Sequence, residues 1–315
     1  MSEYENLLRQ IKSQVPVDES FDLLERKLKI GERDATMFFV DGLVDGDVMQ
    51  RVVASLQGLD KKTVDRAKTA GEFMAYNLAF LDCLLASDMK QGIQFLYSGL
   101  IPLLIDGYDQ IIIIDGRDYP LRSVAEPSKE KSLRGAKDGF VEAMMMNIAL
   151  LRRRIRDNAL IFKIYAVGDV TKTDVSLAYM KDRADMDMVK KMDQTLKQLR
   201  LRGLTVTEQT LVEALTGKKL SWCNPFPKVR YSQRPDIIAA HVEEGKLAVI
   251  VDNSPTVILL PAGIFDFLQD IDDYYFPLLT GNYFRFLRIL NIFVILFATP
   301  VYLLFAEGDI PVNEA

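Results

Sequence analysis

The densest group of side chains that could carry catalysis or hold a cation consists of four aspartates, Asp266, Asp270, Asp272 and Asp273. Paired carboxylates supply an acid and a base in glycoside hydrolysis, and carboxylate oxygens bind calcium. A simpler interpretation is a solvated acidic surface, or an acidic partner for the basic stretch of the chain. We expect the simpler interpretation, and a hydrolase that uses this cluster is the weaker alternative.

The other chemically capable residues stand alone. His241, the single histidine, lies within Ala-Ala-His-Val-Glu-Glu, which predicts a position on a helix surface, and one histidine cannot build a typical zinc site. Cys83 and Cys223 are far apart and form no Cys-x-x-Cys pair, which suits a reducing compartment. No glycine stands five residues before Gly217-Lys218, so the phosphate-loop pattern is missing. The sequence therefore predicts no catalytic, cofactor-binding or metal-binding residues, and a protein that is not an enzyme.

The basic residues concentrate in the stretch from Arg134 to Asp157, which predicts one helix. Asp138-Gly139 is a turn signal, and Asp138 can cap the first helical turn. An apolar run follows, and four arginines stand at the negative end of the helix dipole: Arg152, Arg153, Arg154 and Arg156. Between Lys129 and Lys163, nine basic and four acidic side chains give a local charge of +5 in a chain of net charge −5.

This basic helix has two interpretations. It is either an amphipathic helix with a solvated basic end, or a surface that contacts a protein partner, anionic lipid or an acidic face of the same chain. The candidate interface residues are Arg134, Asp138, Arg152, Arg153, Arg154, Arg156, Arg234 and Asp236. Nucleic acid is not an expected partner, because the basic residues are confined to one short element without interleaved aromatics and the net charge is negative.

The C-terminal region contains a candidate membrane span. Residues Ile289 to Ala306 carry no charge over eighteen positions, which reaches the length needed to cross a bilayer. Arg285 and Arg288 precede the run, and acidic residues follow it. Because positive charges favour the cytoplasmic side, we expect residues 1 to 284 to be cytoplasmic. The alternative is a buried core helix of a soluble protein.

Two segments repeat the same pattern in the region before that run. Gly99 to Ile114 and Gly245 to Leu260 align without gaps at an offset of 146, each with short apolar runs around a turn that predict a hairpin of buried strands. Residues 37 to 48 resemble residues 177 to 188, and Asp45 falls on Asp185 as a residue that starts a helix. The simplest account is a pair of related α/β subdomains.

The predicted organisation is accordingly α/β, with two related subdomains joined by the basic helix and followed by at least one transmembrane helix. Phe21, Leu24 and Leu28 are spaced like one face of a helix, which extends the expected helical lead beyond residue 20. Residues 70 to 97 are also expected to be largely helical. The expected boundaries are 1–33 for the helical lead, 34–133 for the first subdomain, 134–157 for the bridging helix, 158–284 for the second subdomain, 285–306 for the membrane helix and 307–315 for a polar tail.

Several segments resemble a known family. Arg134 to Glu142 with Asn147 to Asp157, and the run Asn-Pro-Phe-Pro-Lys-Val-Arg-Tyr-Ser-Gln-Arg-Pro-Asp that ends at Asp236, are similar to the signatures of GerA-type spore germination receptor A subunits. Asp-Asn-Ser-Pro at 252–255 and Asp-Tyr-Tyr-Phe-Pro at 273–277 resemble the stage V sporulation protein AF branch. The resemblance covers about residues 100 to 300.

This resemblance implies a cytoplasmic region of two α/β subdomains followed by several helices in the inner membrane of the endospore. It also implies homo-oligomers that look like ion channels and work with other germination membrane subunits, whereas the AF branch amplifies ion release downstream. The family continues with further membrane helices, and this sequence has one candidate before Ala315. Because a pore needs several helices, or one from each subunit of a closed ring, we do not expect this chain to conduct ions alone.

Overall fold

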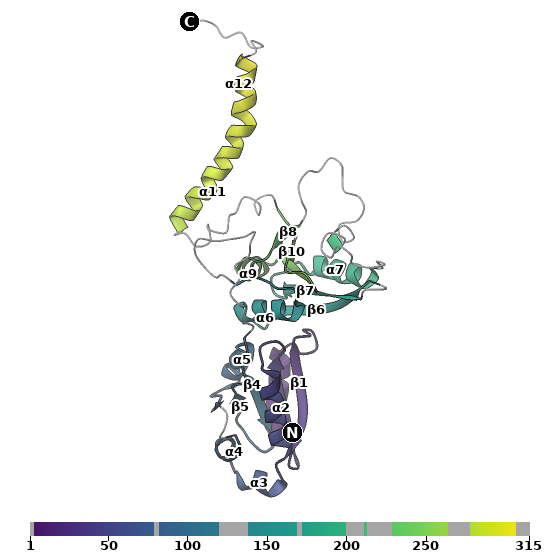
Figure 1. The fold of residues 1–315 in the computed structure, drawn as a ribbon. Coiled ribbons are helices and arrows are strands. Elements are labelled where there is room, and N and C mark those ends of the chain that lie inside the picture. The colour runs from purple at the N-terminus through teal and green to yellow at the C-terminus, as the bar shows by residue number, and fades with distance from the viewer. Residues whose placement is uncertain are drawn as a thin grey trace.

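A computed structural model describes residues 3–78, 82–119, 138–168, 172–199, 211–212, 229–263 and 278–306. Two antiparallel sheets stacked one beyond the other make up most of it, and a long helix stands apart at the C-terminal end (Figure 1). The predicted α/β class is therefore confirmed.

The first sheet has the strand order β1-β2-β4-β5-β3. Its strands are β1 (Leu23–Ile30), β2 (Arg33–Val40), β3 (Cys83–Leu85), β4 (Ile101–Ile105) and β5 (Ile112–Ile114). Both faces of this sheet are covered, which is why β4 and β5 are apolar throughout and β4 is buried at every position.

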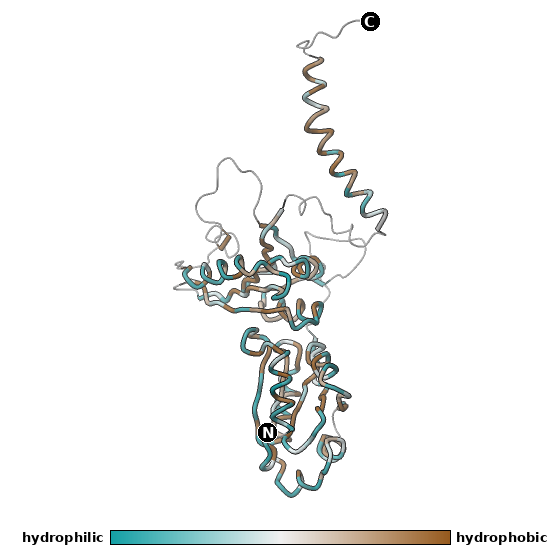
Figure 2. The backbone as a smooth tube through the Cα atoms, turned by 180° about the vertical axis from the view of Figure 1, so that it is seen from behind, coloured by the Kyte–Doolittle hydropathy of each residue, from teal (hydrophilic) through white to brown (hydrophobic). Residues whose placement is uncertain are grey.

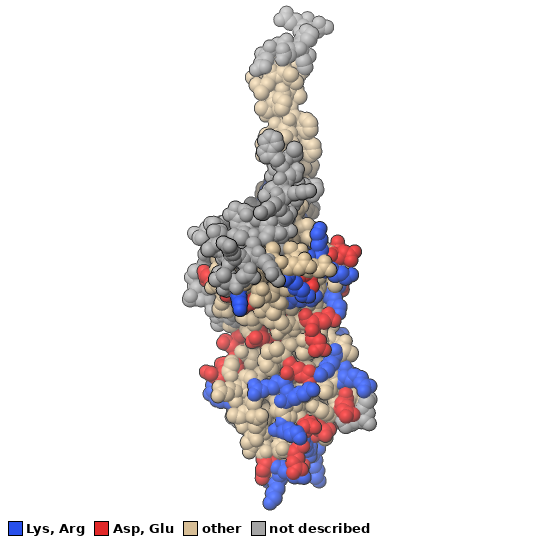
Figure 3. All heavy atoms as spheres, turned by 90° about the vertical axis from the view of Figure 1, so that its right-hand side faces the viewer, with Lys and Arg blue, Asp and Glu red and all other residues tan. Residues whose placement is uncertain are grey.

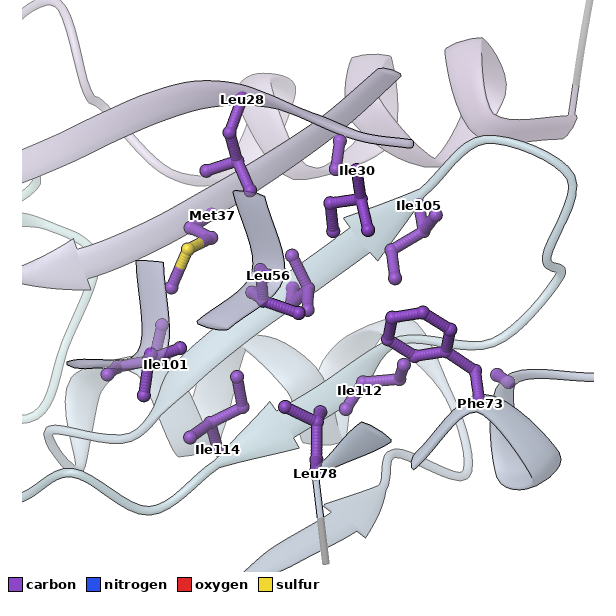
Figure 4. Packing of buried hydrophobic residues seen from close by; sticks show 14 of the residues in the cluster. Leu28, Ile30, Met37, Leu56, Phe73, Leu78, Ile101, Ile105, Ile112 and Ile114 are labelled. Carbon is purple, nitrogen blue, oxygen red and sulfur yellow. The ribbon is translucent and has the colours of Figure 1, made fainter. Parts of the chain in front are cut away.

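Helices cover the two faces of the first sheet. On one face lie α2 (Gly46–Gln57), α3 (Lys61–Arg66) and α4 (Ala70–Asn77), and on the other lie α1 (Glu3–Gln14) and α5 (Met89–Tyr97). Met37 and Phe38 enter different cores because neighbouring strand residues point to opposite faces. Figure 4 shows the first of these cores, where Met37 and Leu56 approach the isoleucines of β4 and β5.

The second sheet has the corresponding order β6-β7-β9-β10-β8. Its strands are β6 (Leu160–Val167), β7 (Thr173–Met180), β8 (Arg230–Ser232), β9 (Leu247–Val251) and β10 (Val257–Leu260). Helix α7 (Met186–Gln198) covers one face, and α6 (Met144–Arg154) and α9 (Pro235–Glu243) cover the other.

The two subdomains share more than their strand order. Helix α1 packs against α5 and β4, and α6 packs in the same way against α9 and β9. Asp45 caps α2 by accepting from the amides two and three residues later at 2.7 and 3.2 Å, and Asp185 caps α7 likewise at 2.9 and 3.3 Å. The predicted internal repeat is confirmed, and it includes the helix that precedes each sheet.

Three expected boundaries change as a result. The helical lead ends at Gln14, and residues 23–30 form β1, because Leu28 and Ile30 alternate with exposed charges at the strand period of two. The basic helix begins at Met144 rather than Arg134, and it opens the second subdomain instead of standing outside both. Strand β3 interrupts the helical region expected between residues 70 and 97.

The C-terminal helix runs through α11 (Leu278–Phe293), a π-helical turn (Val294–Ala298) and α12 (Thr299–Ala306). Residues Thr280–Phe305 are long and apolar enough to cross a membrane, with a mean hydropathy of 2.0 over the most apolar 18 residues. No residue of its most apolar 18-residue window is buried against the described chain, so that window is not a core helix there. The tube along this helix is mostly brown with hydrophilic stretches near its start (Figure 2), and Figure 3 shows the mixed blue and red of the subdomains giving way to tan along it.

Candidate functional site at the junction of the subdomains

Helix α6 lies where the two subdomains meet (Figure 1). Ile148 and Leu151 belong to the core that α6 shares with α9 and the second sheet. Ala149, on another side of the helix, belongs to a core of the first subdomain. A Cβ atom on Gly42, whose φ is +81°, would lie 3.1 Å from the Ala149 Cβ atom, so the backbone approaches closely here. The sequence thus gives α6 two apolar sides, one for each subdomain.

Arg152 crosses this junction as a fully buried cation. Its Nε donates to Asp22 Oδ2 at 2.7 Å and its Nη2 donates to Asp22 Oδ1 at 3.0 Å, so the pair is bidentate. Both side chains are 0% exposed. The guanidinium also donates to the carbonyls of Asp157 at 3.1 Å and Leu160 at 3.0 Å. A buried arginine with these partners is satisfied in both charge and hydrogen bonding.

The segment before β1 is attached to the second sheet. The Phe21 amide donates to the Phe162 carbonyl at 3.2 Å, and the Phe162 amide donates to Ser20 Oγ at 2.9 Å. The Ser20 hydroxyl donates in turn to Asp22 Oδ1 at 2.6 Å. Ser20 and Phe21 therefore attach the turn that leads into β1 to the edge strand β6 at Phe162.

Aromatic rings border the buried pair. The Arg152 guanidinium carbon lies 5.0 Å from the Phe162 ring centroid and 5.5 Å from that of Tyr97. Burial raises the pKa of the Tyr97 phenol. Its hydroxyl is buried and has no hydrogen-bond partner within the described part of the chain. The junction thus combines a satisfied ion pair with one unsatisfied donor.

The other arginines of the cluster also contact their own chain. Arg154 Nη2 donates to both carboxylate oxygens of Asp138 at 2.5 and 2.7 Å, so Asp138 pairs with the end of α6 instead of capping its start. The residue before α6, Ala143, makes no capping hydrogen bond, and the Met144 amide in the first turn donates instead to Asp252 Oδ1 at 3.2 Å. The Arg153 guanidinium carbon lies 4.6 Å from the Tyr119 ring centroid, and exposed Arg156 donates to Ser98 Oγ at 3.3 Å.

The predicted interface residues therefore divide into two groups. Arg152 is buried, and Arg234 is 1% exposed and pairs with Asp236 at 2.6 Å, so the expectation that these two arginines face another subunit or lipid is wrong. Both arginines instead pair with an acidic residue of the same chain, which was the other interpretation of the basic residues. Arg156 is exposed and stays a candidate contact, whereas Arg134 and the aspartates of 266–273 lie outside the described residues.

Sequence reasoning missed the acidic half of the junction. Asp22 and Ser20 lie in a short polar connection with no motif, 130 and 132 residues before Arg152. It also missed Asn147, which is buried and exchanges hydrogen bonds with the Val141 backbone at 2.6 and 2.8 Å, holding the chain that enters α6. The one available signal was the polar Asn147 inside an apolar run.

His241 differs from its expected place on a helix surface. It is on α9 but 0% exposed, because α9 is covered by the sheet on one side and by α6 on another. No group of three or more potential metal ligands occurs among the described residues.

The surface of the junction has a shallow cleft of about 330 Å³. It is lined by the end of α1, the connection to β1 and the start of the second sheet, with charged residues of both signs: Lys12, Glu19, Lys181 and Asp182. Lys181 and Glu19 span it with an ion pair of 2.6 Å. The arrangement as a whole is suited to joining two subdomains, and the charged residues around its cleft are paired within the chain.

Comparison with known proteins gives one consistent result. The sequence profile of the family described as Bacillus/Clostridium GerA spore germination protein matches residues 9–312. Stage V sporulation protein AF of Bacillus subtilis (strain 168) is 34% identical over 294 residues, which are 93% of this chain and 59% of that protein. Spore germination protein KA of the same organism is 28% identical over 289 residues, 91% of this chain and 52% of that protein.

A solved structure also resembles the fold. It is the crystal structure of the N-terminal domain of the A subunit of the Bacillus megaterium spore germinant receptor GerK3, with a TM-score of 0.60 and 26% identity. The match covers 82% of this chain and 94% of that domain. The chain thus corresponds to a little over half the length of the two curated relatives.

Proposed function

The chain belongs to the GerA family of Bacillus/Clostridium spore germination proteins, and on that premise we propose that it is a non-enzymatic membrane subunit of a spore germination complex. It would contribute to ion release during the germination of endospores. Its greater identity to stage V sporulation protein AF than to spore germination protein KA favours the AF branch over the receptor A subunits.

One structural observation carries the proposal: an exposed apolar helix, Thr280–Phe305, follows a two-sheet region that resembles the N-terminal domain of a germinant receptor A subunit. This helix of 26 residues spans about 39 Å, which exceeds the hydrocarbon thickness of a bilayer, and its residues after Arg288 carry no charge. Arg285 and Arg288 near its start favour a cytoplasmic first part of the chain. The proposed location is the inner membrane of the endospore.

Membrane insertion is tested by washing membranes with alkaline carbonate. The full chain should resist extraction, and a chain that ends at residue 277 should be released. If both are released, the helix does not insert and the membrane role fails. Spores that lack the gene should then release ions more slowly on exposure to germinant, with rescue by the full chain and not by the shortened one.

Assembly into a homo-oligomer is the second part of the proposal. Arg156 is the exposed member of the arginine cluster and supports a contact with another subunit. Arg156→Ser should shift the oligomer profile in detergent toward smaller species, and Lys62→Ser, an exposed change on α3, serves as the control. An unchanged profile in Arg156→Ser would remove this residue from the interface.

A second candidate function, binding of a small molecule or ion by the two subdomains, is favoured by the cleft at their junction. Charges of both signs there suit a zwitterion. A ligand present at a hundred times its dissociation constant should stabilise the protein by about 2.7 kcal/mol. A thermal-shift screen of amino acids, sugars and salts tests this function, and Lys181→Ala should abolish any shift that arises in the cleft.

A further inference from the structure

Strand β1 is an open edge of the first sheet (Figure 1). It occupies the place in the repeat that β6 occupies in the second sheet. The edge of β6 is partly covered by the chain itself, because Phe162 is bonded there to Ser20 and Phe21. Within the described residues, no segment forms backbone hydrogen bonds with the outer side of β1. The first sheet can therefore accept one more strand, which is how some domains bind extended peptides.

The open side of β1 carries positive charge. The Asp41 amide donates to the Asp22 carbonyl across the β1–β2 pair, so the residues of β1 at odd positions, among them Lys27 and Lys29, direct their N–H and C=O groups outward. The side chains of these two lysines are 73% and 75% exposed. Each has one acidic side chain of its own chain nearby, at the long distances of 3.9 and 3.8 Å, so both ammonium groups stay accessible to a further acid.

A groove lies beside β1 on the face of the sheet that α2 covers. Its volume is about 290 Å³, and Arg26 borders it together with Met49 and Val53 of α2. Leu24 is on the same face of the strand as Arg26, because alternate side chains share a face, and it is 37% exposed although it is large and apolar. The groove therefore offers an apolar surface next to one guanidinium.

The second subdomain contains an acid that the first subdomain lacks at this place. Lys163 is the equivalent of Arg26, since each is the fourth residue of an eight-residue edge strand. Lys163 lies 3.7 Å from Asp193 of α7, which also pairs with Lys197 at 2.7 Å. Val53 takes the place of Asp193, since each is the eighth residue of its helix, and no acidic side chain pairs with Arg26 within the described residues. The guanidinium in the groove is thus left without the counter-charge that its equivalent has.

We propose that the edge of β1 and this groove bind an extended acidic segment of a partner protein, which adds to the first sheet as a further strand. Carboxylates on one side of that segment would face Lys27 and Lys29. On its other side, an apolar side chain would meet Leu24 and an acidic one would meet Arg26. A second copy of β1 does not suit this edge, because its lysines would face those of the first copy and like charges oppose pairing. The site lies outside the apolar helix, so the proposal goes beyond the membrane role and does not depend on it.

The binding test uses the full chain in detergent and a fluorescein-labelled peptide, Glu-Val-Glu-Asp-Glu-Val-Glu, followed by fluorescence anisotropy. In an extended strand, this peptide places its glutamates on one side and its valines and aspartate on the other. It should bind, and its affinity should fall as the salt concentration rises. A peptide with lysine in place of every acidic residue should not bind. The acidic peptide methylated on the amide nitrogens of its glutamates should not bind either, because it lacks the N–H groups that pair with β1.

Matched variants of the chain separate this site from a general charge effect. Arg26→Glu should weaken binding of the acidic peptide about tenfold or more, because a charged hydrogen bond is replaced by repulsion. Lys62→Glu makes the same charge change at an exposed position of α3 and should leave the affinity nearly unchanged. Lys27→Pro should weaken binding more than Lys27→Ser, because both lose the ammonium group and only proline loses the outward N–H. Unfolding temperatures close to that of the unmodified chain verify that the variants fold.

Three results overturn the proposal. The first is an acidic peptide that does not bind to the unmodified chain. The second is a basic or methylated peptide that binds as well as the acidic one. The third is an equal effect of Arg26→Glu and Lys62→Glu, which would assign the binding to net charge alone.

Discussion

Replacing Asp22 by alanine leaves the Arg152 guanidinium inside the protein without its counter-charge. Both side chains are 0% exposed, so water cannot take the place of the carboxylate without opening the junction. Removal of one partner of a buried ion pair costs about 3–5 kcal/mol. Arg152→Met should cost a similar amount, because it leaves Asp22 buried with the Ser20 hydroxyl as its remaining close partner at this position.

The double replacement should be milder than the sum of the two single ones. With both charges gone, neither is left unpaired, and pairs of this kind are often replaced by apolar residues at little cost. The lasting losses are the hydrogen bonds that Arg152 donates to the carbonyls of Asp157 and Leu160, at about 1 kcal/mol each. We therefore expect a coupling energy between the two positions of at least about 3 kcal/mol.

Thermal unfolding of the full chain in detergent measures this cycle. At roughly 2–4 °C per kcal/mol, each single variant should unfold about 6–20 °C below the unmodified chain. Lys181→Ala, which breaks the half-exposed ion pair with Glu19 across the same junction, is the matched control and should cost no more than about 1 kcal/mol. If the single effects add up to the double effect, or if Asp22→Ala matches this control, the junction is not held by the Arg152–Asp22 pair.

Three further predictions follow from single sites. Gly42→Ala should destabilise the protein by about 1–3 kcal/mol, because its φ of +81° and the Ala149 methyl group at 3.1 Å exclude a side chain. Gly46→Ala is the control in the same unfolding assay, and it should not destabilise the protein because the space around Gly46 is open. Asp45→Ala and Asp185→Ala should each cost about 1 kcal/mol, and a large difference between their unfolding temperatures would contradict equivalent caps in the two subdomains. Burial raises the pKa of the Cys83 thiol to about 11. The rate of its alkylation at pH 8, followed by peptide mass spectrometry, should therefore be about a hundredfold lower than in the unfolded chain. This rate should increase as the pH approaches 11.

Much of the fold could be predicted from the sequence because the same pattern of apolar runs and turns occurs in both subdomains. The hairpins of 99–114 and 245–260 are predicted correctly, since short apolar runs around tight turns have few alternatives. Strand β1 is not, because the spacing of Leu24 and Leu28 also fits a helix and only pairing with β2 decides between them. The spacing of apolar residues within one segment does not predict which strand that segment pairs with.

The candidate site is predicted in part for the same reason. The arginine cluster is visible in the sequence, but charge alone does not tell whether a side chain faces solvent, lipid or its own chain. Arg152 pairs with Asp22, which lies 130 residues earlier in the sequence, and only the stacking of the two subdomains brings the two side chains together. His241 is misplaced because α9 is apolar on nearly all sides once α6 covers it, which the isolated helix does not reveal.

The attachment of Phe21 to β6 has a mechanical consequence. The turn from Ser20 to Leu23 is bonded to the edge of the second sheet and continues directly into β1, the edge of the first. A rotation of one sheet against the other must therefore deform this turn or break the Phe21–Phe162 bond. The turn thus restrains the relative motion of the two sheets, and a displacement of the second sheet would reach the first sheet through Ser20 and Phe21.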